Sequence, residues 1–84
     1  MSYRLFILDE AMQFLIGMKK PERQRLREKL ELIRSYPSNH VEYERRDAAG
    51  RRISGCIVGR HAIEYWEDTA DMDVKVIYIG LADR

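Results

Sequence analysis

The chain has 84 residues, of which 45% are hydrophobic and 35% charged, and its formal net charge is +1. A chain of this length has room for one hydrophobic core, so we expect a single domain over residues 1–84. The balanced charge excludes the overall basicity of a dedicated nucleic-acid-binding protein, although positive charge can still gather locally.

The apolar runs are short, and the longest, at residues 14–18 and 76–79, fall far below the roughly 20 residues that span a bilayer. Asp9 and Glu10 interrupt the N-terminal region before a signal-peptide core can form. We therefore expect a cytoplasmic protein with no membrane partner. The single cysteine, Cys56, has apolar neighbours and no second cysteine or close histidine pair, which predicts a core residue, no metal site and no cofactor.

The N-terminal half predicts a strand and two helices. Residues 3–8 are rich in β-forming side chains, and Asp9 is placed to cap the helix that follows. Apolar spacing of i, i+3, i+4 and i+7 predicts that helix over residues 10–19, with the buried stripe Ala11, Phe14, Leu15 and Met18. Lys19 and Lys20 would suit its C-terminal end, where cations oppose the helix dipole.

Pro21 favours the first turn of a second helix, which carries an apolar stripe of Leu26, Leu30 and Ile33. The sequence around Pro37 ends this helix, because the residue before a proline is pushed out of the helical conformation. From His40 the pattern alternates, and short turns at 47–50, 59–60 and 69–73 separate strands over 52–58, 61–67 and 74–79.

Short turns join antiparallel strands, because parallel neighbours need a crossover of a dozen or more residues. The order predicts an α+β fold. It consists of a strand, a two-helix antiparallel hairpin and a three- to four-stranded antiparallel meander, with both helices covering one face of an antiparallel sheet.

Positive charge gathers in the hairpin region, where residues 45–60 contain five arginines and one acid, Asp47. The guanidinium group matches phosphate oxygens, so these arginines could converge on one RNA-binding surface. Alternatively, they form a solvated hairpin edge that discourages aggregation. The arginines concerned are Arg45, Arg46, Arg51, Arg52 and Arg60, and Arg84 follows at the C-terminus.

Proton-transfer groups gather in residues 61–67. Alternation puts His61, Tyr65 and Glu67 on one face and Glu64 and Trp66 on the other. If the first face is open, His61 is placed to act as a general base; if it faces the helices, His61 and Tyr65 belong to the core. The aromatic rings leave the same choice between stacking on bases and packing in the core; they are Tyr43, Tyr65, Trp66 and Tyr78.

The order of elements resembles the RelE/ParE superfamily of toxins from type II toxin–antitoxin systems, and the likeness covers nearly the whole chain. Residues 58–65 (VGRHAIEY) look like the family's valine–glycine turn and the strand that ends in tyrosine, and residues 74–80 (VKVIYIG) look like its last core strand. The resemblance implies a RelE/ParE-like fold, a cognate antitoxin as partner and, for the ribonucleases of the family, cleavage of messenger RNA at the ribosome that inhibits translation.

Two departures qualify that implication. The ribonucleases usually carry an arginine where this chain has Ala62, and an arginine and a tyrosine after the last strand, where the chain has residues 81–84 (LADR). The hypothesis of an endoribonuclease therefore assigns catalysis to His61, Arg60 and Tyr65. It assigns RNA binding to Arg45, Arg46, Arg51, Arg52 and Arg84. The alternative is a non-catalytic binding module of the same fold, either a ParE-like inhibitor of DNA gyrase or a degenerate antitoxin-binding protein.

Overall fold

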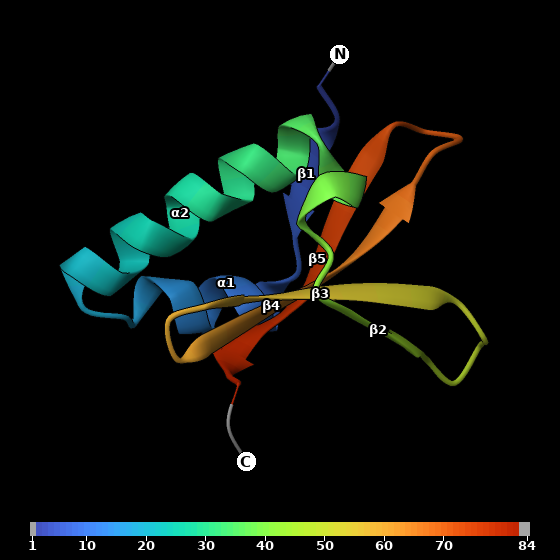
Figure 1. Cartoon of the computed structure of the whole chain (residues 1–84). Helices are drawn as coiled ribbons and strands as arrows, with labels where there is room; N and C mark the ends of the chain where they lie inside the picture. Colours follow the sequence, from blue (N-terminus) through green and yellow to red (C-terminus); the bar gives the residue numbers. More distant parts are fainter. Residues whose placement is uncertain (1, 83–84) are drawn as a thin grey trace.

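The computed structural model describes residues 2–82 and contains two helices, a 3-10 turn and five strands (Figure 1). In chain order these are β1 (Arg4–Ile7), α1 (Asp9–Ile16), α2 (Lys20–Ser35), η1 (Pro37–His40), β2 (Tyr43–Arg46), β3 (Arg52–Val58), β4 (His61–Asp68) and β5 (Asp73–Leu81). The predicted α+β class, the helical hairpin and a four-stranded meander are confirmed.

The strands form one sheet in the order β1-β5-β4-β3-β2. The meander from β2 to β5 is antiparallel throughout, as its short turns require. The expectation of an entirely antiparallel sheet is wrong at one edge, because β1 pairs with β5 in parallel, with Leu5 opposite Val74. Both helices and the strands β2, β3 and β4 separate β1 from β5 along the chain, so no short turn constrains their relative direction.

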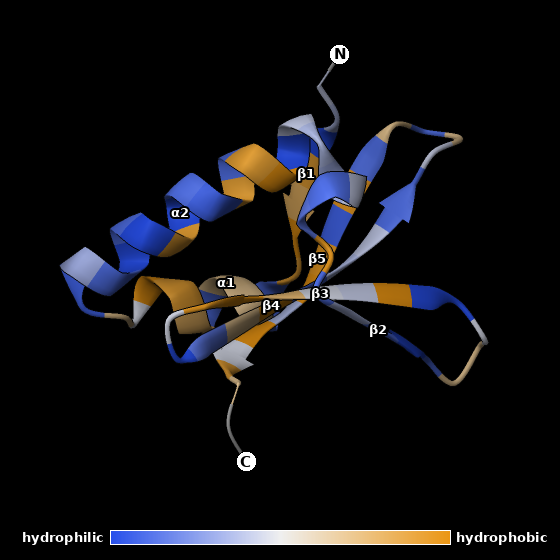
Figure 2. Cartoon of the chain, viewed as in Figure 1, coloured by the Kyte–Doolittle hydropathy of each residue, from blue (hydrophilic) through white to orange (hydrophobic). Residues whose placement is uncertain are grey.

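Both helices lie on the same side of the sheet, and their hydrophobic stripes face it (Figure 2). The predicted α2 stripe of Leu26, Leu30 and Ile33 is confirmed, since each of these side chains is buried. In α1, Ala11 and Leu15 are buried as expected, and so is Met18 just beyond it, but the prediction is wrong for Phe14, which is 38% exposed. These side chains pack against the apolar residues of the central strands, which include Cys56, Ile63, Tyr65, Val74, Val76 and Ile79.

The helix ends differ from the expectation. Asp9 is the first residue of α1 and makes no side-chain cap hydrogen bond, and α1 ends at Ile16 instead of Lys19. Lys19 is the N-cap residue of α2, and Lys20 is its first residue. The two lysines therefore lie at the positive end of the α2 dipole, which is the unfavourable end for a cation.

The thiol of Cys56 is buried in the core, as predicted, and burial raises its pKa to about 11 from the ordinary value of 9.0. The unfolded chain therefore loses this proton at lower pH than the folded chain does. The stabilising contribution is complete below about pH 9 and falls by roughly 2–3 kcal/mol as the pH rises through 11. Urea denaturation at pH 8 and pH 11 should show this fall, and Cys56→Ala should show a smaller one; equal falls would contradict it.

In the described part of the chain, neither helix combines the length and the apolar character that crossing a membrane requires.

Candidate functional site on the open face of the sheet

The sheet has one face against the helices and one that the helices leave uncovered, which we call the open face. Residues directly opposite on paired strands share a face, and successive residues alternate. Because Ile63 and Tyr65 pack against the helices, Glu64 lies on the open face, in one row with Tyr43, Gly55 and Tyr78. This row brings four strands of the meander together at one carboxylate.

Glu64 is the centre of a polar cluster on the open face. The Arg45 guanidinium donates two hydrogen bonds to Oε1 of Glu64, from Nε at 3.0 Å and from Nη2 at 2.8 Å. The Tyr43 hydroxyl donates to Oε2 at 2.8 Å. These bonds to Glu64 raise the pKa of Arg45. The cluster therefore combines a carboxylate, a guanidinium and a phenol, which are groups that can exchange a proton and hold an anion.

Gly55 supports this cluster because it leaves room for the Tyr43 ring, which lies where a side chain at position 55 would begin. Gly55→Ala is expected to cost about 1–3 kcal/mol of unfolding free energy, because the ring must move off the strand and away from Glu64. Gly17→Ala is the matched control. A Cβ at Gly17 would meet only ordinary contacts at a φ of −77°, so that variant should unfold within about 1 kcal/mol of the parent. Equal losses in urea denaturation would refute this account.

The other rings of the open face are held by polar contacts. The guanidinium carbon of Arg51 lies 4.7 Å from the Trp66 ring centroid, and the ammonium of Lys75 lies 4.8 Å from it. The Tyr78 hydroxyl donates to the carbonyl of Leu81 at 3.2 Å. Of the four rings considered from sequence, these observations place only Tyr65 in the core beneath the helices.

Tyr65 is completely buried, and its hydroxyl donates a 2.6 Å hydrogen bond to the carbonyl of Pro37. Desolvation by burial raises the pKa of this phenol. A phenol that is inaccessible and already donates to the main chain is poorly placed to serve a substrate. The geometry favours the packing role of Tyr65 over the catalytic one.

His61 and Arg60 lie at the β3–β4 turn, whereas Tyr65 lies in the middle of β4. His61 is buried, and its ring makes a T-shaped contact with the Phe14 ring, with 5.9 Å between the centroids. Arg60 is exposed, with its Nε 3.5 Å from the Glu22 carboxylate of α2. The structure does not bring these two residues and Tyr65 together at one accessible point.

The hairpin arginines are divided between the two faces of the sheet. Arg45 lies on the open face, whereas Arg46 and Arg52, which are opposite one another in the ladder, lie on the helix side. The Arg46 guanidinium donates to the Gly50 carbonyl at 3.0 Å. Carboxylates hold the others: Arg45 with Glu64 at 2.8 Å, Arg51 with Asp47 at 2.9 Å and Arg52 with Glu44 at 3.7 Å. Arg46 and Arg52 line one pocket, whereas Arg45 and Arg51 are not part of its lining, so the hairpin arginines do not all converge on one surface. Arg84 lies outside the described residues.

An acidic cluster forms at the β4–β5 turn, where carboxylate oxygens of Asp68, Asp71 and Asp73 lie within 4.8 Å of one another. Asp68 accepts a hydrogen bond from the Asp71 amide, which lowers its pKa, and lies 3.4 Å from the Lys75 ammonium. Asp73 pairs with Arg4 at 2.9 Å. Turn formation and ion pairing account for these contacts.

Comparison with known proteins identifies the fold. No protein-family model and no curated protein matches the chain. Solved structures do match. The archaeal RelE–RelB complex from Pyrococcus horikoshii OT3 aligns with a TM-score of 0.83 at 16% identity, over 100% of this chain and 99% of that one.

The intact E. coli RelBE toxin–antitoxin complex aligns with a TM-score of 0.76 at 19% identity, over 99% of this chain and 100% of the other. The isolated E. coli RelE toxin aligns with a TM-score of 0.70 at 19% identity, over 99% and 87%. These TM-scores, over nearly the whole chain, establish the fold, and at identities of 16–19% they establish the fold alone. It is an α+β fold of the RelE type, as the resemblance predicted.

Proposed function

We propose that this chain is the toxin component of a type II toxin–antitoxin system and that a cognate antitoxin holds it inactive in the cytoplasm. One observation carries the proposal: the RelE-like fold extends over essentially the full length of both this chain and a RelE seen in complex with RelB. Fold alone does not determine activity, so the proposal depends on a test of the pair.

The test uses the neighbouring reading frame, which should encode the antitoxin. Co-expression of the two proteins with an affinity tag on this chain should recover both in a stable complex. A tagged chain that never retains the neighbouring product would contradict the proposed pairing. A tagged Gly17→Ala variant should form the same complex, because this substitution makes only ordinary contacts and is expected to leave the fold unchanged.

For the released toxin, we propose action on messenger RNA at the ribosome through the open face. Glu64 would accept the proton of a 2′-hydroxyl as its oxygen attacks the neighbouring phosphorus and forms a 2′,3′-cyclic phosphate. The bond from phosphorus to the 5′-oxygen breaks, and this oxygen takes a proton from water. Arg45 would turn from Glu64 to the phosphate and offset its developing charge. The set predicted from sequence, His61, Arg60 and Tyr65, is less well placed, because two of its members are buried. Purified protein added to translating ribosomes should yield cleaved message.

A second candidate is the non-catalytic binding module, which the pairing of hairpin arginines with carboxylates favours. An arginine that is paired with a carboxylate must break that ion pair before it binds a phosphate, and this reduces the free energy gained on binding. Under this candidate, message stays intact at saturating protein. Arrested growth with DNA damage would then indicate gyrase as the target, and unchanged growth would indicate a protein that only binds the antitoxin.

A further inference from the structure

The basic residues fall into two groups according to their contacts. Every described arginine and lysine outside residues 19–29 has a hydrogen-bond or ion-pair partner. The partners are Asp73 for Arg4, Glu31 for Arg34, Glu64 for Arg45, the Gly50 carbonyl for Arg46, Asp47 for Arg51, Glu44 for Arg52, Glu22 for Arg60 and Asp68 for Lys75. The hairpin arginines that dominate the sequence pattern are thus already engaged.

Within residues 19–29, five cations make no hydrogen bond or ion pair with any described residue. They are Lys19, Lys20, Arg25, Arg27 and Lys29, on the α1–α2 turn and the first turns of α2. Residues 19–35 contain seven of the fifteen basic residues and three of the fourteen acids, a net charge of +4. The rest of the chain then carries −3. The net charge of +1 therefore hides a strongly uneven distribution of charge between residues 19–35 and the rest of the chain.

The local acids do not neutralise this part of α2. Glu22 lies toward Arg60 at 3.5 Å, and Glu28 accepts a hydrogen bond from Gln24 at 3.3 Å. Lys19 and Lys20 add positive charge at the end of α2 where the helix dipole is already positive, which is an unfavourable arrangement unless an anion binds there. A cation without an ion-pair partner can bind a phosphate without first breaking an ion pair. Binding a polyanion therefore costs less free energy at residues 19–29 than at the paired hairpin arginines.

We propose that the first half of α2, through these five unpaired cations, binds the sugar–phosphate backbone of RNA. Lys20 and Arg27 are seven residues apart and share one side of the helix, while Arg25 and Lys29, four apart, share another. Cations spread along two sides of a helix match a string of phosphates. This surface rests on the proposed action on RNA and adds to it a contact away from the sheet.

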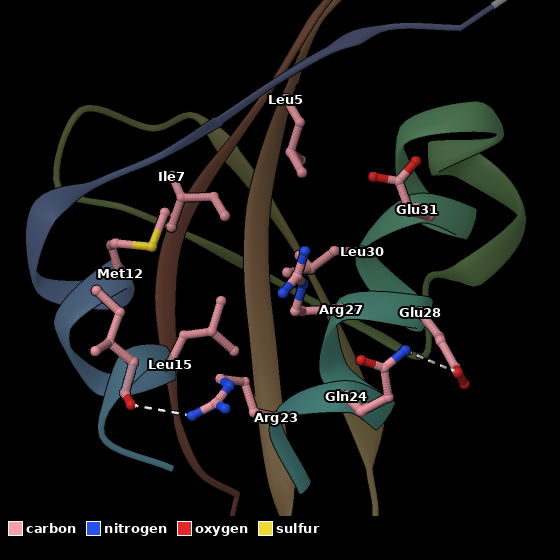
Figure 3. Close-up of a pocket in the computed structure, with 11 residues that line it drawn as sticks. Leu5, Ile7, Met12, Leu15, Arg23, Gln24, Arg27, Glu28, Leu30 and Glu31 are labelled. Carbon is pink, nitrogen blue, oxygen red and sulfur yellow. Dashed lines mark hydrogen bonds between the residues drawn. The ribbon is translucent and has the colours of Figure 1, made fainter. Parts of the chain in front are cut away.

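A groove of about 670 Å³ borders one side of α2, and Figure 3 shows its apolar wall opposite the charged one. Leu5, Ile7 and Leu15 form part of the apolar wall, and Arg27 lines the opposite side. A protein segment in this groove would reach Arg27 but not Arg25 or Lys29, which do not line it. The position of the unpaired charge on both sides of the helix therefore favours a nucleic acid over a protein helix.

The test compares two triple variants that each remove three positive charges. One is Lys20→Gln/Arg25→Gln/Arg27→Gln on α2, and the control is Arg46→Gln/Arg51→Gln/Arg52→Gln on the hairpin. Glutamine retains good helix propensity, and circular dichroism checks folding. The probe is a fluorescein-labelled oligouridylate of about 20 nucleotides, measured by anisotropy with the full chain over a salt series.

The α2 variant should bind the oligouridylate about tenfold more weakly, and the slope of log K against log salt should become shallower by about 2. The hairpin variant should change much less. An α2 variant with unchanged RNA affinity, or a hairpin variant that loses as much, overturns the proposal. RNA affinity retained together with loss of the antitoxin complex would make this surface a protein-binding one. The failure of message cleavage by the parent refutes only the proposed catalysis and leaves this binding result standing.

Discussion

Tyr65→Ala is expected to lose about 3–5 kcal/mol of unfolding free energy. The side chain is completely buried, and truncating a buried aromatic ring loses its transfer free energy and leaves a cavity. Total stabilities of small domains are about 5–15 kcal/mol, so this loss is a large fraction of the total and the variant should unfold at a much lower urea concentration than the parent. Urea denaturation followed by circular dichroism measures the loss, with Tyr36→Ala as the control because Tyr36 is 60% exposed.

Tyr65→Phe separates packing from catalysis at the same position. It keeps the ring and removes the hydroxyl that donates to the Pro37 carbonyl, which should cost about 1–3 kcal/mol. On the packing account, the folded variant keeps the activity of the parent. Full stability combined with lost activity would instead support the catalytic role predicted from sequence.

Glu64→Gln is expected to reduce ribosome-dependent message cleavage by about 100-fold or more, because the amide cannot accept a proton as the carboxylate does. The amide oxygen can still accept the hydrogen bond from Tyr43, and the lost pair with the partly exposed Arg45 is worth about 1 kcal/mol or less. The variant should therefore remain folded. Primer extension on message recovered from translating ribosomes measures the cleavage.

Glu44→Gln is the matched control for that variant. Glu44 also contacts an arginine, Arg52 at 3.7 Å, but it lies on the helix side of the sheet. Its replacement should leave cleavage unchanged. If both variants cleave as the parent does, the open face is not the reactive one. A parent that leaves message intact would support the non-catalytic candidate.

The element order was predictable because it depends on local patterns. The α2 stripe of Leu26, Leu30 and Ile33 and the positive φ of Gly50 and Gly59 follow from spacing and turn chemistry within a few residues. The parallel β1–β5 pairing joins the first and last strands, so it depends on the path of the whole chain between them. No pattern within β1 specifies it.

The candidate site was harder to predict because its residues meet through strand register. Tyr43 and Arg45 lie on β2 and Glu64 on β4, with β3 between them. Their contact therefore depends on the register of both the β2–β3 and the β3–β4 pairs. A glycine inside β3, Gly55, was the local signal that another group approaches the strand closely there. The number of arginines in the hairpin predicted an RNA-binding surface there. The sequence does not show that carboxylates from other strands and from α2 pair with these arginines.

Growth after induction of this chain, with and without the neighbouring reading frame, tests the toxin assignment most directly. The account predicts arrest when the chain is made alone and normal growth when both proteins are made, with the two recovered together. Normal growth in both cultures, with the chain accumulating as a folded protein that retains no partner, would contradict it.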